Sequence, residues 1–86
     1  MIFISMIKFK KNAKEVVKSG KEIMQNLPSG IKMVGTYWTL GKFDAVWVYE
    51  ASSEKDAMKL GVMASEVMRF QTMTAVSRDD AMKLLD

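Results

Sequence analysis

Three side chains in the middle of the sequence are the best candidates for chemistry: the phenol of Tyr37 and the carboxylates of Asp44 and Glu50. Tyr37 and Asp44 flank a short segment containing glycine, so a hairpin there would bring them close together. A phenol that donates a proton beside a carboxylate that accepts one can bind a small polar molecule. The alternative is structural, because an aspartate near a turn often accepts hydrogen bonds from nearby backbone N–H groups. We favour the structural interpretation of Asp44, and Glu50 is either a third member of the site or an ordinary carboxylate at a strand end.

Four aromatic residues alternate along the same two segments and are predicted to share one face of a sheet. An exposed aromatic face of this size marks an interface or a ligand site. Since each buried aromatic side chain contributes about 1.5–3 kcal/mol, we favour packing between subunits and expect a homodimer or higher oligomer. The alternatives are the lining of a small-molecule cavity and the stacking of nucleic-acid bases. The four residues are Trp38, Phe43, Trp47 and Tyr49.

The composition removes several classes of function. The chain has no cysteine and no histidine, which excludes thiolate nucleophiles, Cys-rich metal sites and the usual base near neutral pH. There is no glycine-rich phosphate loop, and no apolar run approaches the roughly 20 residues of a membrane helix. We therefore expect no metal, no cofactor, no membrane partner and a cytoplasmic location, with any acid–base chemistry left to Asp, Glu, Lys or Tyr.

Charge is distributed unevenly along the chain, whose formal net charge is +3. Residues 1–42 carry eight lysines and two acidic residues, whereas residues 43–86 carry five basic and eight acidic residues. A basic half can attract an anionic partner, but solvated helix faces are the more ordinary explanation. The segment 42–49 lacks the spacing of glycine and aromatic residues that RNA-recognition motifs use, so nucleic-acid binding is the least favoured function.

Hydrophobic periodicity and capping residues predict the order β-α-β-β-α-β-α. Asn12, Ser53 and Ser77 each stand three residues before an acidic residue, which is typical of helix starts. The first strand is apolar on both of its alternations and should therefore be central in its sheet. The predicted elements are a strand Ile2–Phe9, a helix from Asn12 to Leu27, strands Ile31–Thr39 and Phe43–Ala51 joined tightly around Gly41, a helix from Ser53, a strand Phe70–Val76 and a short helix from Ser77.

This order predicts one domain over residues 1–86, an α+β ferredoxin-like βαββαβ plait with a four-stranded antiparallel sheet and a short extra C-terminal helix. Right-handed crossovers give the strand order 4-1-3-2 and place both main helices on one face. With an even-length hairpin loop, Val34 shares the face of Trp47, and Met33 lies on the opposite face. The second helix should be the more deeply buried, because a second apolar stripe widens its buried surface; that stripe is Met58, Val62 and Met63.

The stretch from Gly35 to Ala51 resembles the GYD domain family, small bacterial and archaeal proteins with a Tyr-x-Thr-Leu-Gly-x-Tyr-Asp hairpin. Phe43 stands where the family has its second tyrosine, and the likeness extends over most of the chain. The resemblance implies a dimeric α/β barrel related to the ferredoxin-like fold, and it implies no established biochemical activity. The matching residues are Tyr37, Thr39, Leu40, Gly41 and Asp44.

The sequence therefore predicts a GYD-like module that forms a homo-oligomer through its sheet face and binds a small ligand. One alternative is a cofactor-free oxygenase or isomerase that uses Tyr37 and Asp44, which rests on fold analogy alone. The other is a protein that binds single-stranded nucleic acid.

Overall fold

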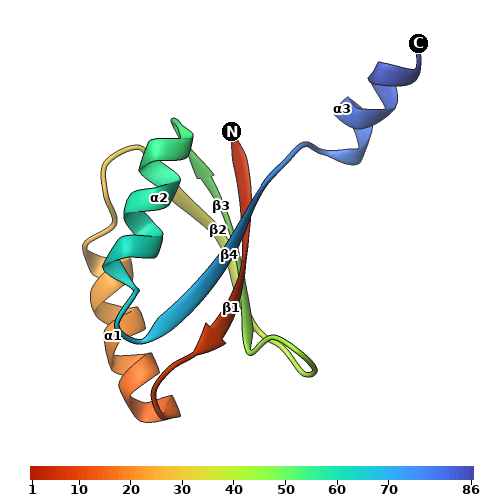
Figure 1. The fold of residues 1–86 in the computed structure, drawn as a ribbon. Helices are drawn as coiled ribbons and strands as arrows, with labels where there is room; N and C mark the ends of the chain where they lie inside the picture. Colours follow the sequence, from red (N-terminus) through yellow and green to blue (C-terminus); the bar gives the residue numbers. More distant parts are fainter.

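The computed structural model describes residues 1–86 as a four-stranded antiparallel sheet with two main helices (Figure 1). The strand order is β2-β3-β1-β4, so the two strands that the sequence predicts to be central are central. The ferredoxin-like α+β fold is thus confirmed, including the additional C-terminal helix. The elements are β1 (Ile2–Phe9), α1 (Ala13–Gln25), β2 (Ile31–Trp38), β3 (Ala45–Ala51), α2 (Glu54–Met63), β4 (Met68–Ala75), α3 (Arg78–Met82) and a 3-10 turn (Lys83–Leu85).

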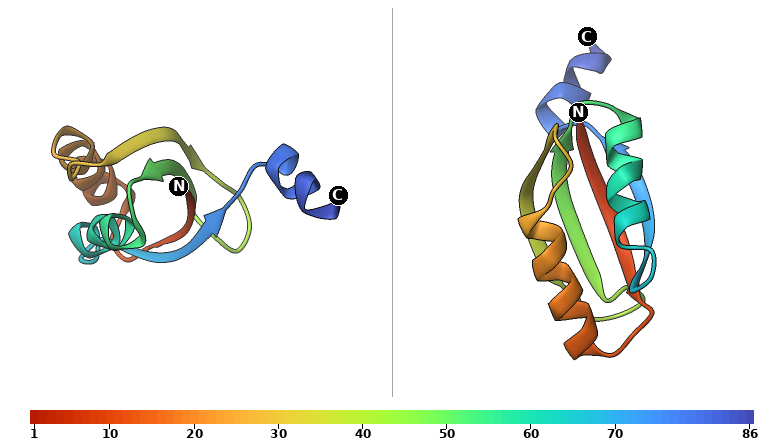
Figure 2. Two further views of the ribbon diagram at one scale, coloured as in Figure 1. Left: turned by 90° about the horizontal axis from the view of Figure 1, so that it is seen from above. Right: turned by 90° about the vertical axis from the view of Figure 1, so that its left-hand side faces the viewer.

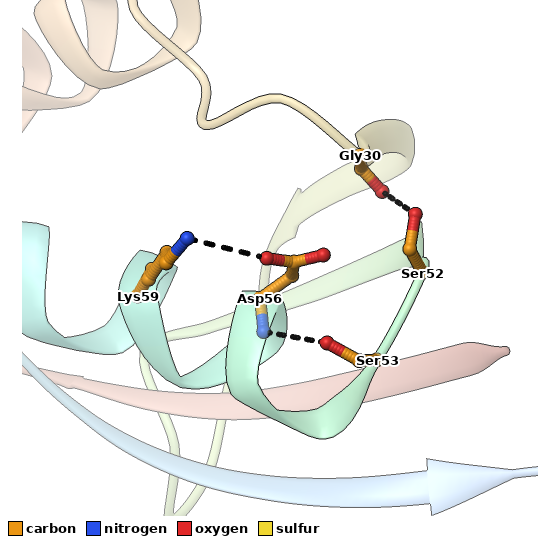
Figure 3. Close-up of polar contacts among 5 residues, drawn as sticks. All are labelled: Gly30, Ser52, Ser53, Asp56 and Lys59. Atoms are coloured by element: carbon orange, nitrogen blue, oxygen red, sulfur yellow. Dashed lines mark hydrogen bonds and ion pairs between the residues drawn. The ribbon is translucent and has the colours of Figure 1, made fainter.

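Each helix begins at the capping residue that the sequence predicts. The side chain of Asn12 accepts a hydrogen bond from the backbone N–H of Glu15, and Ser53 and Ser77 cap α2 and α3 in the same way. In Figure 3, Ser53 Oγ accepts from the N–H of Asp56 at 3.2 Å, and Lys59 Nζ lies 3.5 Å from the Asp56 carboxylate. These bonds satisfy backbone donors that the first turn of a helix leaves without partners.

The loop before β2 is fastened beside the start of α2. Ser52 Oγ donates to the carbonyl oxygen of Gly30 at 3.4 Å (Figure 3). Gly30 has φ +87°, a conformation that L side chains rarely adopt, and an added Cβ would lie 2.8 Å from Ser52 Oγ and 3.0 Å from Asp56 Oδ2. Only glycine fits this crossing of two loops without strain.

Both α1 and α2 cover the same face of the sheet, and the other face has no helix packed on it (Figure 2). We call these the helix face and the open face. Paired residues on neighbouring strands share a face, so the pair Phe3 and Tyr49 places alternate residues of β1 and β3 against the helices. The core lies entirely in this layer. Its members are Phe3, Ile7, Val16, Ile23, Ala45, Trp47, Tyr49, Ala51, Ala57, Leu60, Ala64, Val67 and Met68.

A β-bulge between Met33 and Gly35 changes the register that the sequence predicts for β2. On the C-terminal side of the bulge, toward the hairpin loop, Thr36 pairs with Trp47 and Tyr37 pairs with Val46, as expected for an even-length loop. On the N-terminal side of the bulge, Met33 pairs with Tyr49 and its side chain lies on the helix face, while Val34 is 62% exposed. The predicted faces of Met33 and Val34 are therefore wrong, because one extra residue in a strand reverses its alternation.

The hairpin and the second helix also differ from expectation. Six residues, 39–44, separate β2 from β3, so the connection is a wider loop than the tight turn predicted, although Gly41 does take a positive φ of 98°. The second helix buries only a narrow stripe of Ala57 and Leu60. The wider stripe expected to be buried lies in solvent: Met58 is 70% exposed, Val62 is 68% exposed and Met63 is 42% exposed.

Candidate functional site

The open face is the most distinctive surface of the molecule. Ile4 pairs with Val48 and Met6 pairs with Val46, so apolar side chains from the two central strands meet in its middle. These four are half-buried by their neighbours, and no element of the chain packs over them. Around this centre lie Val34, Tyr37 and Met73, and charged residues stand toward the ends, where Lys32 pairs with Glu50. An apolar centre with a polar rim has the anatomy of a protein interface.

Two of the predicted interface residues do not reach this face. Trp47 is 5% exposed and Tyr49 is completely buried, and both lie in the core beneath the helices. Trp47 meets Phe70 edge-on with ring centroids 5.4 Å apart, and Tyr49 stacks on Phe3 at 5.9 Å. The prediction that these aromatics form an outer face is wrong. Both alternations of β3 are apolar, and the helices cover the aromatic one instead of the aliphatic one.

The remaining two aromatics lie near one end of the sheet. Trp38 pairs with Ala45 on the helix face, but it sits at the edge and is 60% exposed, with its ring 5.2 Å from that of Phe9. It borders a small groove against α1 of about 390 Å³. Phe43 belongs to the loop and is half-buried, with Lys42 Nζ 5.7 Å from its ring centroid. The four aromatics therefore form no common patch.

Asp44 fastens the loop to the first strand. Its carboxylate Oδ2 accepts a hydrogen bond from the N–H of Phe9 at 2.7 Å, and its own N–H donates to the carbonyl of Ile7 at 2.8 Å. The base of the loop is closed by Thr39, whose N–H donates to the carbonyl of Asp44 at 2.9 Å. The Asp44 carboxylate therefore accepts a hydrogen bond from a backbone N–H, as the structural interpretation has it, but this N–H belongs to Phe9 at the end of β1 and not to the turn itself.

Tyr37 and Glu50 both lie on the open face without forming one site. Tyr37 pairs with Val46, and Glu50 follows four residues later on β3, near the opposite end of the sheet. The Tyr37 ring lies over Gly35, because a Cβ added to Gly35 would come within 2.8 Å of it. No hydrogen bond joins Tyr37 to Asp44 or Glu50, so the three candidate residues occupy separate places.

A chain of hydroxyl groups crosses the core, and the sequence interpretation missed it. Ser5 Oγ lies 2.8 Å from Tyr49 Oη and 2.8 Å from Thr72 Oγ1, which links three strands. Ser5 is completely buried, and no buried side-chain polar atom lacks a partner. The signal was a lone serine in the middle of the apolar strand β1, which demands a hydrogen-bonding partner on a neighbouring strand.

A groove of about 560 Å³ lies between α2 and β4. Met58, Val62 and Phe70 provide much of its apolar wall, and Thr72 reaches it from the hydroxyl chain. Lys10 and Arg69 also line it, and neither forms an ion pair. Sequence reasoning expected Met58 and Val62 to be buried and so did not identify this groove.

No group of three or more acidic side chains is positioned to hold a metal ion. None of the helices combines the length and the hydropathy that spanning a lipid bilayer requires.

Comparison with known families gives one result. The family model described as "GYD domain" matches residues 3–85, which is nearly the whole chain. No curated protein and no solved structure matches the chain.

Proposed function

The chain belongs to the GYD domain family, and we propose that it works as a homodimeric module in which two copies pack their open faces together. The observation that carries the proposal is the apolar centre of this face, where Ile4, Met6 and Val48 lie with no helix over them. Such patches on small proteins mark sites of interaction. Charged residues at the rim, such as Lys32 and Glu50, favour a defined orientation over nonspecific association.

The size of the core supports the same proposal. Only 14 of the 86 residues are buried, and all of them belong to the helix layer. A domain of this length has a thin margin of stability, and many such domains gain more by oligomerising. Each aliphatic side chain removed from water contributes about 1.5–3 kcal/mol when fully buried. Two facing open faces would bury a second apolar layer, aliphatic at its centre where the first layer is rich in aromatic residues.

Light scattering coupled to size-exclusion chromatography tests the proposal. The wild-type protein should run as a dimer at micromolar concentration, and Val48→Lys should run as a folded monomer. Val17→Lys is the matched control, because Val17 is an exposed valine of α1 away from the open face, and this variant should remain a dimer. A wild-type monomer, or a Val48→Lys protein that stays dimeric, would contradict the proposal.

The other functions proposed from the sequence have less support. An oxygenase or isomerase site at Tyr37 and Asp44 would need the two side chains together, whereas the Asp44 carboxylate is bonded to the N–H of Phe9. Stacking of nucleic-acid bases would need several aromatic residues on the open face, and Tyr37 is the aromatic residue of β2 and β3 that lies there. Binding of a small ligand is compatible with the proposed dimer, but no additional residue of the structure supports it.

A further inference from the structure

The C-terminal segment Ser77–Asp86, which we call the arm, projects away from the rest of the protein. It leaves the end of β4 on the side of the sheet opposite α1 and α2, and its helix α3 extends outward (Figures 1 and 2). The molecule consequently measures 48 × 31 × 16 Å, and its radius of gyration is 13.6 Å. A compact domain of this length has a radius of gyration of about 12 Å.

The arm exposes apolar side chains that a protein ordinarily buries. Leu84 is 82% exposed, Leu85 is 86% exposed and Met82 is 48% exposed. Met82 ends the five-residue helix α3, and both leucines lie in the 3-10 turn Lys83–Leu85 that follows it; a single ion pair, Lys83 to Asp80 at 3.4 Å, joins the two. An isolated helix so short is unstable in water, because most helical stability in proteins comes from tertiary packing. The arm therefore needs a surface to pack against.

The groove between α2 and β4 has the chemistry that the arm requires. Its exposed apolar wall contains Met58 and Val62, which suit the two leucines of the arm. Its charged lining consists of two cations, Lys10 and Arg69, which form no ion pair, and one acid, Glu54, whereas the arm has three aspartates and two basic residues. Opposite charges on two surfaces favour their association and fix its orientation.

The arm of the same molecule does not fill this groove. The groove lies on the helix side of the sheet, and the arm lies on the other side. A second copy of the chain offers the same groove, and in a twofold dimer the two arms would exchange reciprocally. We propose that the arm of one copy docks into the groove between α2 and β4 of a second copy. Leu84 and Leu85 then pack against Met58 and Val62, and the aspartates of the arm face Lys10 and Arg69.

Cysteine crosslinking tests this exchange directly, because the natural chain contains no cysteine. A full-length chain carrying Leu84→Cys and Val62→Cys is treated with a short bis-maleimide and separated by denaturing electrophoresis. The expected product is a covalent dimer, whose two joined peptides are identified by mass spectrometry. The control chain carries Leu84→Cys and Lys14→Cys, since Lys14 is exposed on α1 and lines neither groove; it should crosslink at least five-fold less.

Three outcomes would overturn the proposal. A crosslink within one chain would mean that the arm folds back on its own body. Equal yields from the test chain and the Lys14 control would mean that the arm does not select the groove. A higher yield from Leu84→Cys with Val17→Cys would place the arm in the groove beside Trp38 instead.

Charge reversal in the crosslinking chain tests the proposed pairing of opposite charges. Asp79→Lys, made in the crosslinking chain, should lower the yield several-fold, and adding Arg69→Asp should restore it. Failure of the second change to restore the yield would exclude the pairing of these charges. The exchange uses residues that the open face does not. Crosslinking therefore tests the arm, and light scattering on Val48→Lys separately tests the open faces.

Discussion

The two faces of the sheet are built from the same strands and have opposite surroundings. On β1, Phe3 and Ile7 are at most 2% exposed under the helices, whereas their neighbours Ile4 and Met6 face outward with nothing packed on them. On β3, Trp47 lies in the core and Val48 lies on the open face. The comparison teaches that hydrophobic alternation identifies which residues share a face, but a strand apolar on both sides does not reveal which face the helices of its own chain will cover.

Substitution of the neighbours Trp47 and Val48 should separate the two faces with the largest effect. Trp47→Lys removes a large buried ring and places a charge among Phe3, Phe70 and the helices, which should cost at least about 3–5 kcal/mol and abolish cooperative unfolding. Val48→Lys places the same charge on the open face, and its circular dichroism spectrum should remain that of a folded protein. If both variants unfold alike, the distinction between the faces is wrong.

The hydroxyl chain allows a finer test of the helix face. Ser5→Ala leaves the buried phenol of Tyr49 without its partner and should lower the free energy of unfolding by about 1–3 kcal/mol in urea titration. The double variant Ser5→Ala with Tyr49→Phe removes both hydroxyl groups and should be more stable than Ser5→Ala alone. A double variant less stable than either single one would show that the phenol contributes to stability through some other contact.

Substitution of Gly30, where two loops cross, should lower the free energy of unfolding by less than the substitutions in the core. Gly30→Ala forces a Cβ into a left-handed conformation and against Ser52 and Asp56, and we expect a loss of about 1–2 kcal/mol in the free energy of unfolding. Gly20→Ala is the control, because Gly20 lies in α1 with nothing within 4 Å of an added Cβ. It should stabilise the protein by about 0.5–1 kcal/mol.

Gly35→Ala should change the stability of the protomer least of these substitutions, but it should measurably weaken the association of two copies. The added methyl group would displace the Tyr37 ring from its place over Gly35 on the open face, where the ring is free to move outward. In a monomeric Val48→Lys background, we expect unfolding to change by less than about 1 kcal/mol. In the otherwise natural chain, sedimentation should show a weaker dimer. An unchanged dimer would place Tyr37 outside the interface.

Much of the fold could be predicted because its signals are local. Asn12 and Ser53 mark helix starts through side-chain bonds within one turn, and these bonds are present. The doubly apolar pattern of Ile2–Phe9 places that strand in the centre of the sheet. The bulge at Met33 could not be predicted, because a methionine or a valine is acceptable on either face and only the assembled sheet decides between them.

The candidate site was less accessible to sequence reasoning. Tyr37 and Glu50 do lie on the open face, but the partner of Asp44 is a backbone group 35 positions earlier in the chain. The predicted outer position of Trp47 is wrong, because both alternations of β3 are apolar and the sequence does not reveal which of them the helices cover. The serine at position 5 could have corrected this, since its buried hydroxyl requires a partner such as Tyr49 on the same face.

The bond between the Asp44 carboxylate and the Phe9 N–H has a consequence for how this protein can vary. It anchors the Asp44 end of the 39–44 loop to β1, and the hydrogen bond from the Thr39 N–H to the Asp44 carbonyl closes the base of the loop, while Leu40 at the tip is fully exposed. Lengthening that tip or grafting a foreign peptide into it would leave the strands in register. The loop thus provides a ready attachment point for tags and reporters, provided that the aspartate at its base is kept.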